Sequence, residues 1–254
     1  MRIKVLGCSG GVGPDLRTTS LLINDELLVD AGTGIGDLTL DQMSRITDVL
    51  LTHSHLDHVC GLAFMADNLF GLIDRPLRVH ATAATIDALR RHLFNWVIWP
   101  DFSQLPDAEH PLITFHEITP DVPFTVCGLA VVGFTVLHTV PAIGYALDSG
   151  EGVFAFSGDT YACEALLSAL NKLPRLDRLM IEVAFPDEDA ALGELSRHFT
   201  PHLLGAELRK LRHRPQLFLT HHKPGVEPAI QRECVDALAA WDYSHLKRGD
   251  IILS

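Results

Sequence analysis

The sequence has no apolar run long enough to cross a membrane. Its longest apolar stretches are interrupted by Asp, Asn or Gly well short of the ~18 residues that a transmembrane helix requires. The first eight residues, MRIKVLGC, resemble a short leader before a lipidated cysteine, but a signal peptide needs an apolar region of ~7–15 residues. We therefore expect a cytoplasmic protein with no membrane partner, whose first residues form a β-strand ending in a glycine turn.

Basic residues and cysteine motifs are also scarce. Lys and Arg together number 20 against 32 Asp and Glu, so the formal net charge is −12. An acidic surface repels phosphate backbones, which argues against a nucleic-acid partner. The five cysteines are scattered, odd in number and without CxxC spacing, so we expect free thiols in a reducing compartment.

The chain has the length and the alternation of elements typical of one α/β domain. Its 254 residues contain no linker, repeat or low-complexity segment, so we interpret 1–254 as a single domain. Hydrophobic patterning predicts strands over 3–6, 20–23, 27–29, 49–52, 77–80, 114–118, 129–137, 143–147, 153–157, 178–182 and 216–220. It predicts helices over 56–70, 83–93, 162–170, 201–211 and 228–241. Two β-rich runs, each bracketed by helices, indicate a four-layer αββα sandwich, with 251–253 available as an edge strand and Asn24-Asp25 as a hairpin turn.

The segment 94–111 has a different character. It contains Trp96, Trp99 and Phe102 together with Pro100 and Pro106, and we interpret it as an irregular or partly helical insertion. Its aromatic side chains could belong to a satellite core, to the wall of a substrate pocket or to a dimer contact.

The strongest chemical signal is the sequence Thr-His-Ser-His-Leu-Asp-His at 52–58, directly after a predicted buried strand. Side chains alternate along a strand, so His53 and His55 point to the same side. One helical turn then brings Asp57 and His58 to a neighbouring position. Imidazole and carboxylate ligands suit Zn²⁺, Mn²⁺ or Fe²⁺. The alternative, a solvated polar loop, is disfavoured because burying so many unpaired polar groups is costly.

Three further residues of ligand type stand where predicted apolar strands end. His138 follows 129–137, Asp159 follows 153–157, and His221 follows 216–220. Taken singly, each could be a capping or solvated residue. Together with the histidine cluster, the repeated placement favours metal ligation.

This order of residues resembles that of the metallo-β-lactamase fold hydrolases. The pattern is His-x-His-x-Asp-His followed by a later His, an Asp and a final His, and the resemblance covers nearly the whole chain. Asp30 matches the structural aspartate that precedes the metal loop in that family. The resemblance implies two divalent metal ions, with Zn²⁺ as our first expectation, and a hydroxide between them. It assigns His53, His55 and His138 to the first metal, Asp57, His58 and His221 to the second, and Asp159 to both.

Within that family the cluster is similar to the signature of the class II cyclic-nucleotide phosphodiesterases, His-x-His-Leu-Asp-His-x-x-Gly-Leu. This chain departs from the signature after Leu62, where it continues Ala-Phe-Met-Ala-Asp. The resemblance implies a small-molecule phosphodiester substrate, namely a 3′,5′-cyclic nucleotide such as cyclic AMP, which the bridging hydroxide opens to the 5′-monophosphate. It also allows a homodimer.

Two later segments resemble parts of these phosphodiesterases and of ribonuclease Z. They are Ser-Arg-His-Phe-Thr-Pro at 196–201 and Ile-Glu-Val-Ala-Phe at 181–185. By that resemblance Glu182 holds His198, which protonates the leaving oxygen as a general acid. The alternative is that His198 only caps the helix that begins near Pro201. Asp57 is a second catalytic candidate that orients the hydroxide, and Lys223 is either a phosphate-binding residue or a solvated lysine.

Three other functions remain open. A ribonuclease Z-like endonuclease that processes tRNA 3′ ends is disfavoured because the chain is acidic and has no long basic insertion to grip tRNA. Hydrolysis of a thioester, lactone or β-lactam is also compatible with the family. A metal-stabilised binding or sensor protein without turnover belongs to a different class.

The glycine-rich segment 7–13 lacks a phosphate-loop ending, and we interpret it as a turn at the rim of the site.

Overall fold

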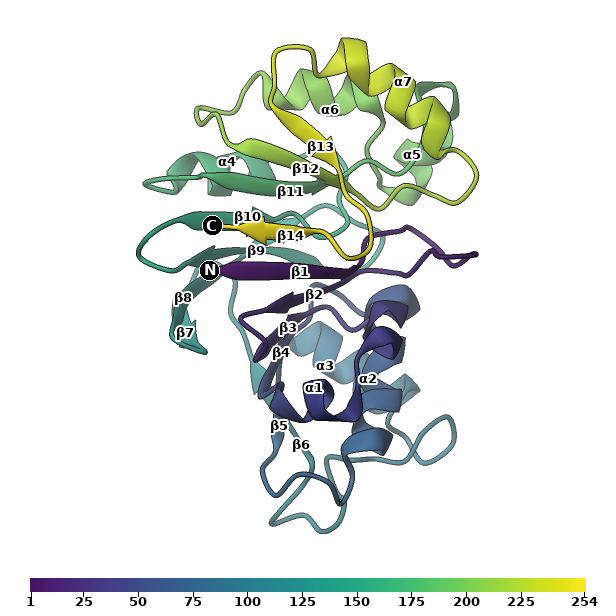
Figure 1. Ribbon diagram of the computed structural model, residues 1–254, viewed down its shortest axis with the longest axis vertical. Helices are drawn as coiled ribbons and strands as arrows, with labels where there is room; N and C mark the ends of the chain where they lie inside the picture. Colours follow the sequence, from purple (N-terminus) through teal and green to yellow (C-terminus); the bar gives the residue numbers. More distant parts are fainter.

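Two seven-stranded sheets face each other and carry helices on their outer faces (Figure 1). The structure is a computed structural model that describes all residues from Met1 to Ser254. The first sheet has the order β14 (Ile251–Leu253), β1 (Arg2–Gly7), β2 (Ser20–Ile23), β3 (Leu27–Val29), β4 (Asp48–Leu50), β5 (Leu77–Ala81) and β6 (Ile113–Glu117). The second has the order β13 (Tyr243–His245), β12 (Gln216–Thr220), β11 (Arg178–Glu182), β10 (Val153–Phe156), β9 (Ala142–Asp148), β8 (Leu129–Val136) and β7 (Phe124–Val126).

Three helices cover the first sheet and four cover the second (Figure 1). The first group is α1 (Leu40–Arg45), α2 (Leu56–Leu69) and α3 (Ala83–His92); the second is α4 (Glu164–Lys172), α5 (Ala190–Ser196), α6 (Pro201–Leu208) and α7 (Glu227–Ala237). Two short 3₁₀ turns, η1 (Thr33–Asp37) and η2 (Asp187–Asp189), complete the elements. The αββα sandwich predicted from the sequence is confirmed. The interpretation of 1–254 as one domain stays a prediction.

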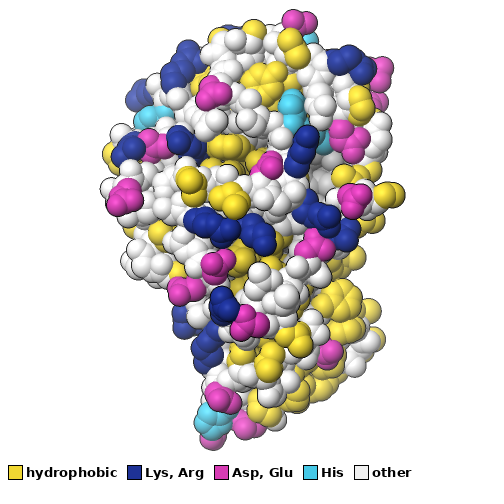
Figure 2. All heavy atoms as spheres, in the orientation of Figure 1, with side chains coloured by type: hydrophobic (Ala, Val, Ile, Leu, Met, Phe, Trp, Pro, Cys, Tyr) yellow, Lys and Arg dark blue, Asp and Glu magenta, His cyan; other side chains and the backbone are white.

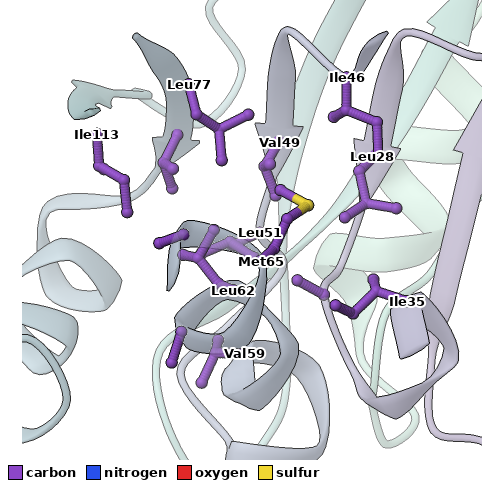
Figure 3. Packing of buried hydrophobic residues seen from close by; sticks show 14 of the residues in the cluster. Leu28, Ile35, Ile46, Val49, Leu51, Val59, Leu62, Met65, Leu77 and Ile113 are labelled. Carbon is purple, nitrogen blue, oxygen red and sulfur yellow. The ribbon is translucent and has the colours of Figure 1, made fainter. Parts of the chain in front are cut away.

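Apolar side chains fill all three interfaces between the four layers. Strand residues such as Leu21, Val29 and Phe154 form the core between the two sheets. A second cluster lies between the first sheet and its helices, and a third lies between the second sheet and α4, α6 and α7. Figure 3 shows how α2 presents Val59 and Leu62 to the strands. Their spacing of three residues places them on one helix face. This face packs against the sheet, which fixes the position of the first turn of α2.

The direction of the strands explains why functional residues can meet at one edge. Strands β3 to β6 are parallel, and so are β10 to β13. β8 pairs antiparallel with β9, which pairs antiparallel with β10, so β8 runs in the same direction as β10. The carboxyl ends of β8, β10, β11 and β12 therefore share one edge of the second sheet, and side chains that follow these strands can converge there.

Most predicted elements are confirmed, with shifted ends. The hairpin at Asn24-Asp25 joins antiparallel β2 and β3, and both residues have positive φ (49° and 62°), as a tight primed turn requires. The strand 251–253 pairs with β1 at the sheet edge. The predicted strand 49–52 ends at Leu50, because the Thr52 amide turns to the Asp30 carboxylate (2.8 Å).

Several short elements were missed, namely α1, α5, β7, β13 and the two 3₁₀ turns. They are stabilised by local bonds or by pairing with a neighbouring strand. For example, α1 begins with a capping box between Thr39 and Gln42. The segment 94–111 was expected to be irregular or partly helical, and the structure shows the irregular form. Two of its aromatic side chains, Phe94 and Phe102, are buried in the core beneath the first sheet, which agrees with the satellite-core interpretation.

No helix combines the length and the apolar character that spanning a membrane would need.

Candidate metal centre

The seven predicted metal ligands come together at one edge of the sandwich. They form two groups in which the ligand atoms lie within 4.8 Å of one another. The first group is His53, His55 and His138; the second is Asp57, His58, Asp159 and His221. His53 and His55 follow β4, Asp57 and His58 lie in the first turn of α2, and the other three follow β8, β10 and β12. The fold thus brings together every ligand candidate, from four separate chain segments.

Asp159 lies between the two groups. Its Oδ2 atom is 3.3 Å from His58 Nε2, 3.2 Å from His221 Nε2 and 3.9 Å from His53 Nε2. Ligands bound to one zinc ion at ~2.0–2.1 Å in tetrahedral geometry would lie about 3.4 Å apart. The distances to His58 and His221 are close to this value, and the carboxylate of Asp159 also approaches His53 of the other group.

Two imidazole nitrogens that face Asp159 are buried without a hydrogen-bond partner. They are Nε2 of His53 and Nε2 of His58. Buried polar atoms of this kind normally have partners, because leaving them unsatisfied costs free energy. A divalent cation would satisfy both nitrogens, so this donor set fits the metal that the sequence predicts.

The outward nitrogens of the same histidines are held by hydrogen bonds. His58 Nδ1 donates to Asp30 Oδ2 at 2.7 Å. His53 Nδ1 donates to the Thr52 hydroxyl at 2.9 Å, and that hydroxyl donates in turn to Asp30 Oδ2 at 2.8 Å. Partners on Nδ1 leave Nε2 free to face the centre. Asp30 therefore orients one histidine of each group, directly or through Thr52.

Two ligands of the first group also have polar partners. His138 Nδ1 donates to the backbone carbonyl of Arg197 at 3.2 Å. His55 presents Nδ1 to His138 Nε2 at 3.0 Å, and its Nε2 lies 3.4 Å from the Thr139 hydroxyl. His55 therefore faces the centre through Nδ1, whereas His53 and His138 face it through Nε2.

Burial sets the protonation of this centre. Desolvation lowers the pKa of His53 and of His221 well below the ordinary value, and it lowers the pKa of His138 to about 4. Burial raises the pKa of Asp159, but attraction to His221 and His58 outweighs it and holds the pKa well below normal. His53, His138 and His221 are therefore neutral and Asp159 is ionised, as metal ligation requires. His58 differs: burial lowers its pKa, but the charges of Asp159 and Asp30 outweigh burial and hold the pKa well above normal, so this ring must release a proton to bind a metal.

Beside the centre lies a buried histidine–glutamate pair. His198 Nδ1 donates to Glu182 Oε1 at 2.8 Å, and the His198 ring centroid is 5.0 Å from that of His138. Burial lowers the pKa of His198, but the charge of Glu182 outweighs it and the pKa ends above normal. Glu182 Oε1 also accepts from the Thr160 amide at 2.9 Å. The same carboxylate therefore holds His198 and the residue after Asp159.

The helix-cap alternative for His198 does not match this geometry. Thr200 occupies the cap position of α6, and no side chain makes a capping bond there. His198 instead directs its ring between Glu182 and the metal centre, where its ligand atom lies within 4.8 Å of those of His138 and Asp159.

The last two candidates line the same centre. Lys223 Nζ lies 3.2 Å from His221 Nε2 and donates to the Gly10 carbonyl at 3.0 Å. A Cβ atom on Gly10 would lie 2.5 Å from the His221 carbonyl oxygen, so the segment 7–13 packs against His221 as a rim that needs glycine. Asp57 Oδ2 is 3.7 Å from His58 Nε2, and its side chain is 30% exposed. Asp57 is therefore the partly exposed member of a group whose other three side chains are buried.

Sequence reasoning missed the residues that orient the ligands. Thr52 belongs to the motif at 52–58, and its position next to His53 could have suggested the hydrogen bond between its hydroxyl and the His53 ring. Thr139 and Thr160 each follow a predicted ligand, but nothing local distinguishes them from ordinary loop residues. Arg197 acts through a backbone carbonyl, for which a side-chain pattern gives no signal.

Comparisons with known proteins agree with this geometry. A family profile described as "Beta-lactamase superfamily domain" matches residues 25–222. The chain is 28% identical over 251 residues to a Yersinia pestis protein named "Probable 3',5'-cyclic-nucleotide phosphodiesterase", covering 82% of this chain and 71% of that protein. It is 30% identical over 155 residues to a ribonuclease Z of Methanopyrus kandleri, covering 58% and 50%. The crystal structure of unliganded yeast PDE1 has a TM-score of 0.82 at 20% identity and covers 100% of this chain and 99% of that one. These findings confirm the fold predicted from the sequence.

Proposed function

The chain belongs to the β-lactamase superfamily, and we propose that it is a dinuclear metal-dependent phosphodiesterase that hydrolyses a 3′,5′-cyclic nucleotide to the 5′-monophosphate. One observation carries this proposal: the His198–Glu182 pair stands beside a carboxylate placed between two ligand groups. Phosphodiester hydrolysis needs charge stabilisation, a nucleophile and a proton for the leaving oxygen, and this combination can supply all three. The name of the Yersinia pestis relative supports the choice of a cyclic nucleotide.

The seven ligand residues would hold two divalent cations, with Zn²⁺ as the first candidate and Mn²⁺ or Fe²⁺ as alternatives. Such ions, when bound, offset phosphate charge and make water a nucleophile near neutral pH. Their stable retention would depend on Asp30 and Thr52, which hold the histidine rings in place.

The chain's own residues would carry the proton transfer. His198 is held at Nδ1 by Glu182, so Nε2 is the nitrogen that would donate to the departing ribose oxygen. The negative charge of Glu182 stabilises the imidazolium form until that transfer. Asp57, the open carboxylate of its group, would orient the attacking water, and Lys223 would pair with a phosphate oxygen.

Metal content and activity measured on one purified batch would test the proposal. Cyclic AMP, a chromogenic bis-aryl phosphodiester and a tRNA precursor would be assayed side by side. We expect about two metal ions per chain, as a two-metal site requires, with cyclic AMP cleaved fastest. Cleavage of the aryl diester alone would support the assignment as a phosphodiesterase but contradict a cyclic nucleotide as its substrate.

The same experiment, extended to a thioester, a lactone and a β-lactam, decides between the remaining alternatives. The match to an archaeal ribonuclease Z favours a tRNA-processing enzyme as the second candidate, and fastest cleavage of the tRNA precursor would select it. Full metal content without turnover of any diester would favour a binding or sensor protein. Activity on a thioester, lactone or β-lactam alone would select another hydrolase of the superfamily.

We further propose that the chain forms a homodimer through an apolar patch made by the outer face of α2 and the loop 94–99. Val97 is 84% exposed and Ile98 is 61% exposed. Phe64 on α2 is also exposed, and its ring centroid lies 5.4 Å from that of Trp99 in the same loop. The lower right of Figure 2 shows apolar side chains gathered on this part of the molecule. Asn95 Oδ1 accepts from the amides of Val97 (3.0 Å) and Ile98 (2.8 Å), so the loop presents its side chains in a fixed arrangement.

The charges around this patch favour a second copy as its occupant. Neither α2 nor residues 94–99 contain Lys or Arg, and α2 carries Asp67 on its exposed face. α3 ends in Arg90 and Arg91 immediately before the loop. A two-fold axis through the patch would place the basic edge of one copy against the acidic edge of the other. The net charge of −12 on the whole chain opposes self-association through other surfaces.

Val97→Asp is expected to convert a dimer into a monomer. A buried charge at an apolar contact should weaken association by ~30-fold or more, the scale of an interface hot spot. Sedimentation equilibrium at micromolar concentrations measures this directly. Val235→Asp is the matched control, since Val235 is 60% exposed on α7, outside the patch. A monomeric wild type, or a Val97→Asp variant that stays dimeric, would rule the interface out.

A further inference from the structure

Arg197 has an unusual backbone conformation for a residue with a long side chain. It ends α5 in the left-handed region, with φ 61° and ψ 52°. The next amide, that of His198, donates to the Gly193 carbonyl at 2.8 Å, as in a Schellman ending. Glycine is the usual residue at this position, because a Cβ atom there costs ~1–2 kcal/mol. The arginine therefore calls for a reason other than helix termination.

The backbone of Arg197 connects two parts of the candidate centre. Its carbonyl accepts the hydrogen bond from Nδ1 of His138 at 3.2 Å. The peptide unit that contains this carbonyl leads directly into His198. A shift of this one peptide would therefore rotate the His138 ring and move His198 at the same time.

The side chain of Arg197 packs on the strand ends that carry the ligands. Its guanidinium carbon lies 5.8 Å from the centre of the Tyr161 ring, over its face. The Tyr161 amide donates to the Leu137 carbonyl at 2.8 Å, and Leu137 directly precedes His138. Tyr161 also follows Thr160, whose amide is held by Glu182. The side chain thus contacts a residue fixed to both neighbouring ligand segments.

We propose that Arg197 is a positioning residue that locks the segment carrying His198 to the strand ends carrying His138 and Asp159. The carbonyl sets the orientation of the first ligand group, and the side chain keeps that carbonyl in place through Tyr161. The peptide of Arg197 would then position both a ligand of the first metal and the proton donor His198. This inference rests on the proposed function, because it assigns this shared positioning to metal binding and proton transfer.

Arg197→Gly separates this role from helix termination. Glycine accepts the left-handed conformation without strain, so thermal stability should be unchanged or higher. Divalent-metal affinity at one of two positions should nevertheless fall ~10–100-fold, as it does when an outer partner of a ligand is lost. Chelator competition with Zn²⁺ measures the affinity, and a thermal melt of the same sample measures stability. With the chromogenic bis-aryl phosphodiester, kcat should fall while KM stays constant.

Two further variants make the comparison specific. Tyr161→Ala removes the packing partner and should reproduce the loss of metal affinity. Asp121→Gly is the matched control, because Asp121 is an exposed non-glycine residue with φ 64°, in a turn between β6 and β7. It should gain the same relief of backbone strain with no change in metal affinity or kcat.

Several outcomes would overturn the inference. Wild-type metal affinity and kcat in Arg197→Gly would reduce Arg197 to a helix stop. A raised KM with unchanged metal affinity would make the side chain a direct substrate contact. The metal titration uses no substrate, so a wrong substrate assignment leaves it valid. A wild-type protein that binds no divalent metal would instead overturn the proposed function, and this inference with it.

Discussion

Asp159→Ala is expected to abolish metal retention and turnover together. Asp159 Oδ2 lies within 3.9 Å of nitrogens from both ligand groups, so it is the one side chain that would serve both metal positions. Its removal should weaken metal binding by more than the ~10–100-fold that the loss of an outer partner costs. The variant also leaves buried imidazoles around a space with no compensating charge.

Metal analysis after gel filtration, together with the rate on the bis-aryl diester, would measure both effects. Asp107→Ala is a suitable control, because Asp107 is an exposed loop carboxylate bonded only to neighbouring residues. It should retain full metal content and rate. An Asp159→Ala protein that keeps two metals per chain would show that Asp159 does not bridge the two positions.

His198→Ala is expected to keep both metals and lose ~10²–10⁴-fold in kcat, the scale of a general acid. His198 donates to Glu182 through Nδ1, and none of the seven predicted ligands depends on its side chain for orientation. The metal content should therefore match that of the wild type. Loss of metal would instead show that His198 is a ligand, since its ring also lies near His138 and Asp159.

The pH profile provides a second readout for His198. A general acid must be protonated, so the wild-type rate should fall as the pH rises through the pKa of His198. Burial lowers that pKa, but Glu182 raises it by more, so the protonated form should persist to a higher pH than for an ordinary histidine. His198→Ala should remove this alkaline limb.

His202→Ala is the matched control for both readouts. His202 also pairs with a carboxylate, that of Asp187, and its pKa is also raised by that pairing. It is exposed on α6 and belongs to neither ligand group. Its replacement should leave metal content, kcat and the alkaline limb unchanged.

The sequence alone was informative wherever a local pattern carried the signal. β12 contains three successive apolar residues and is followed by His221, and the motif at 52–58 follows β4, so the ends of strands could be located by composition. Alternation along a strand placed His53 and His55 on one side, and these two are found in one ligand group. The hairpin at Asn24-Asp25 was likewise readable, because few residue pairs tolerate positive φ twice.

The sequence was less informative about short elements. α1 has six residues, and its start depends on a reciprocal bond between Thr39 and Gln42. β7 and β13 have three residues each and exist because a neighbouring strand pairs with them. Such elements have too few residues for a periodic pattern, so capping bonds and pairing with a neighbouring strand decide their structure.

By itself, the sequence determined which residue types stand at the ends of apolar strands, and with them the layered fold and the ligand candidates. Only the tertiary structure decided which nitrogen of each histidine faces the centre. For His53, His58 and His138 that choice depends on hydrogen bonds to Thr52, Asp30 and the Arg197 carbonyl, respectively. It also decided that Asp159 lies between the two groups, because strand order brings β4, β8, β10 and β12 to one edge. Strand composition is a local property, whereas the orientation of a ring depends on atoms up to 59 residues away in the chain.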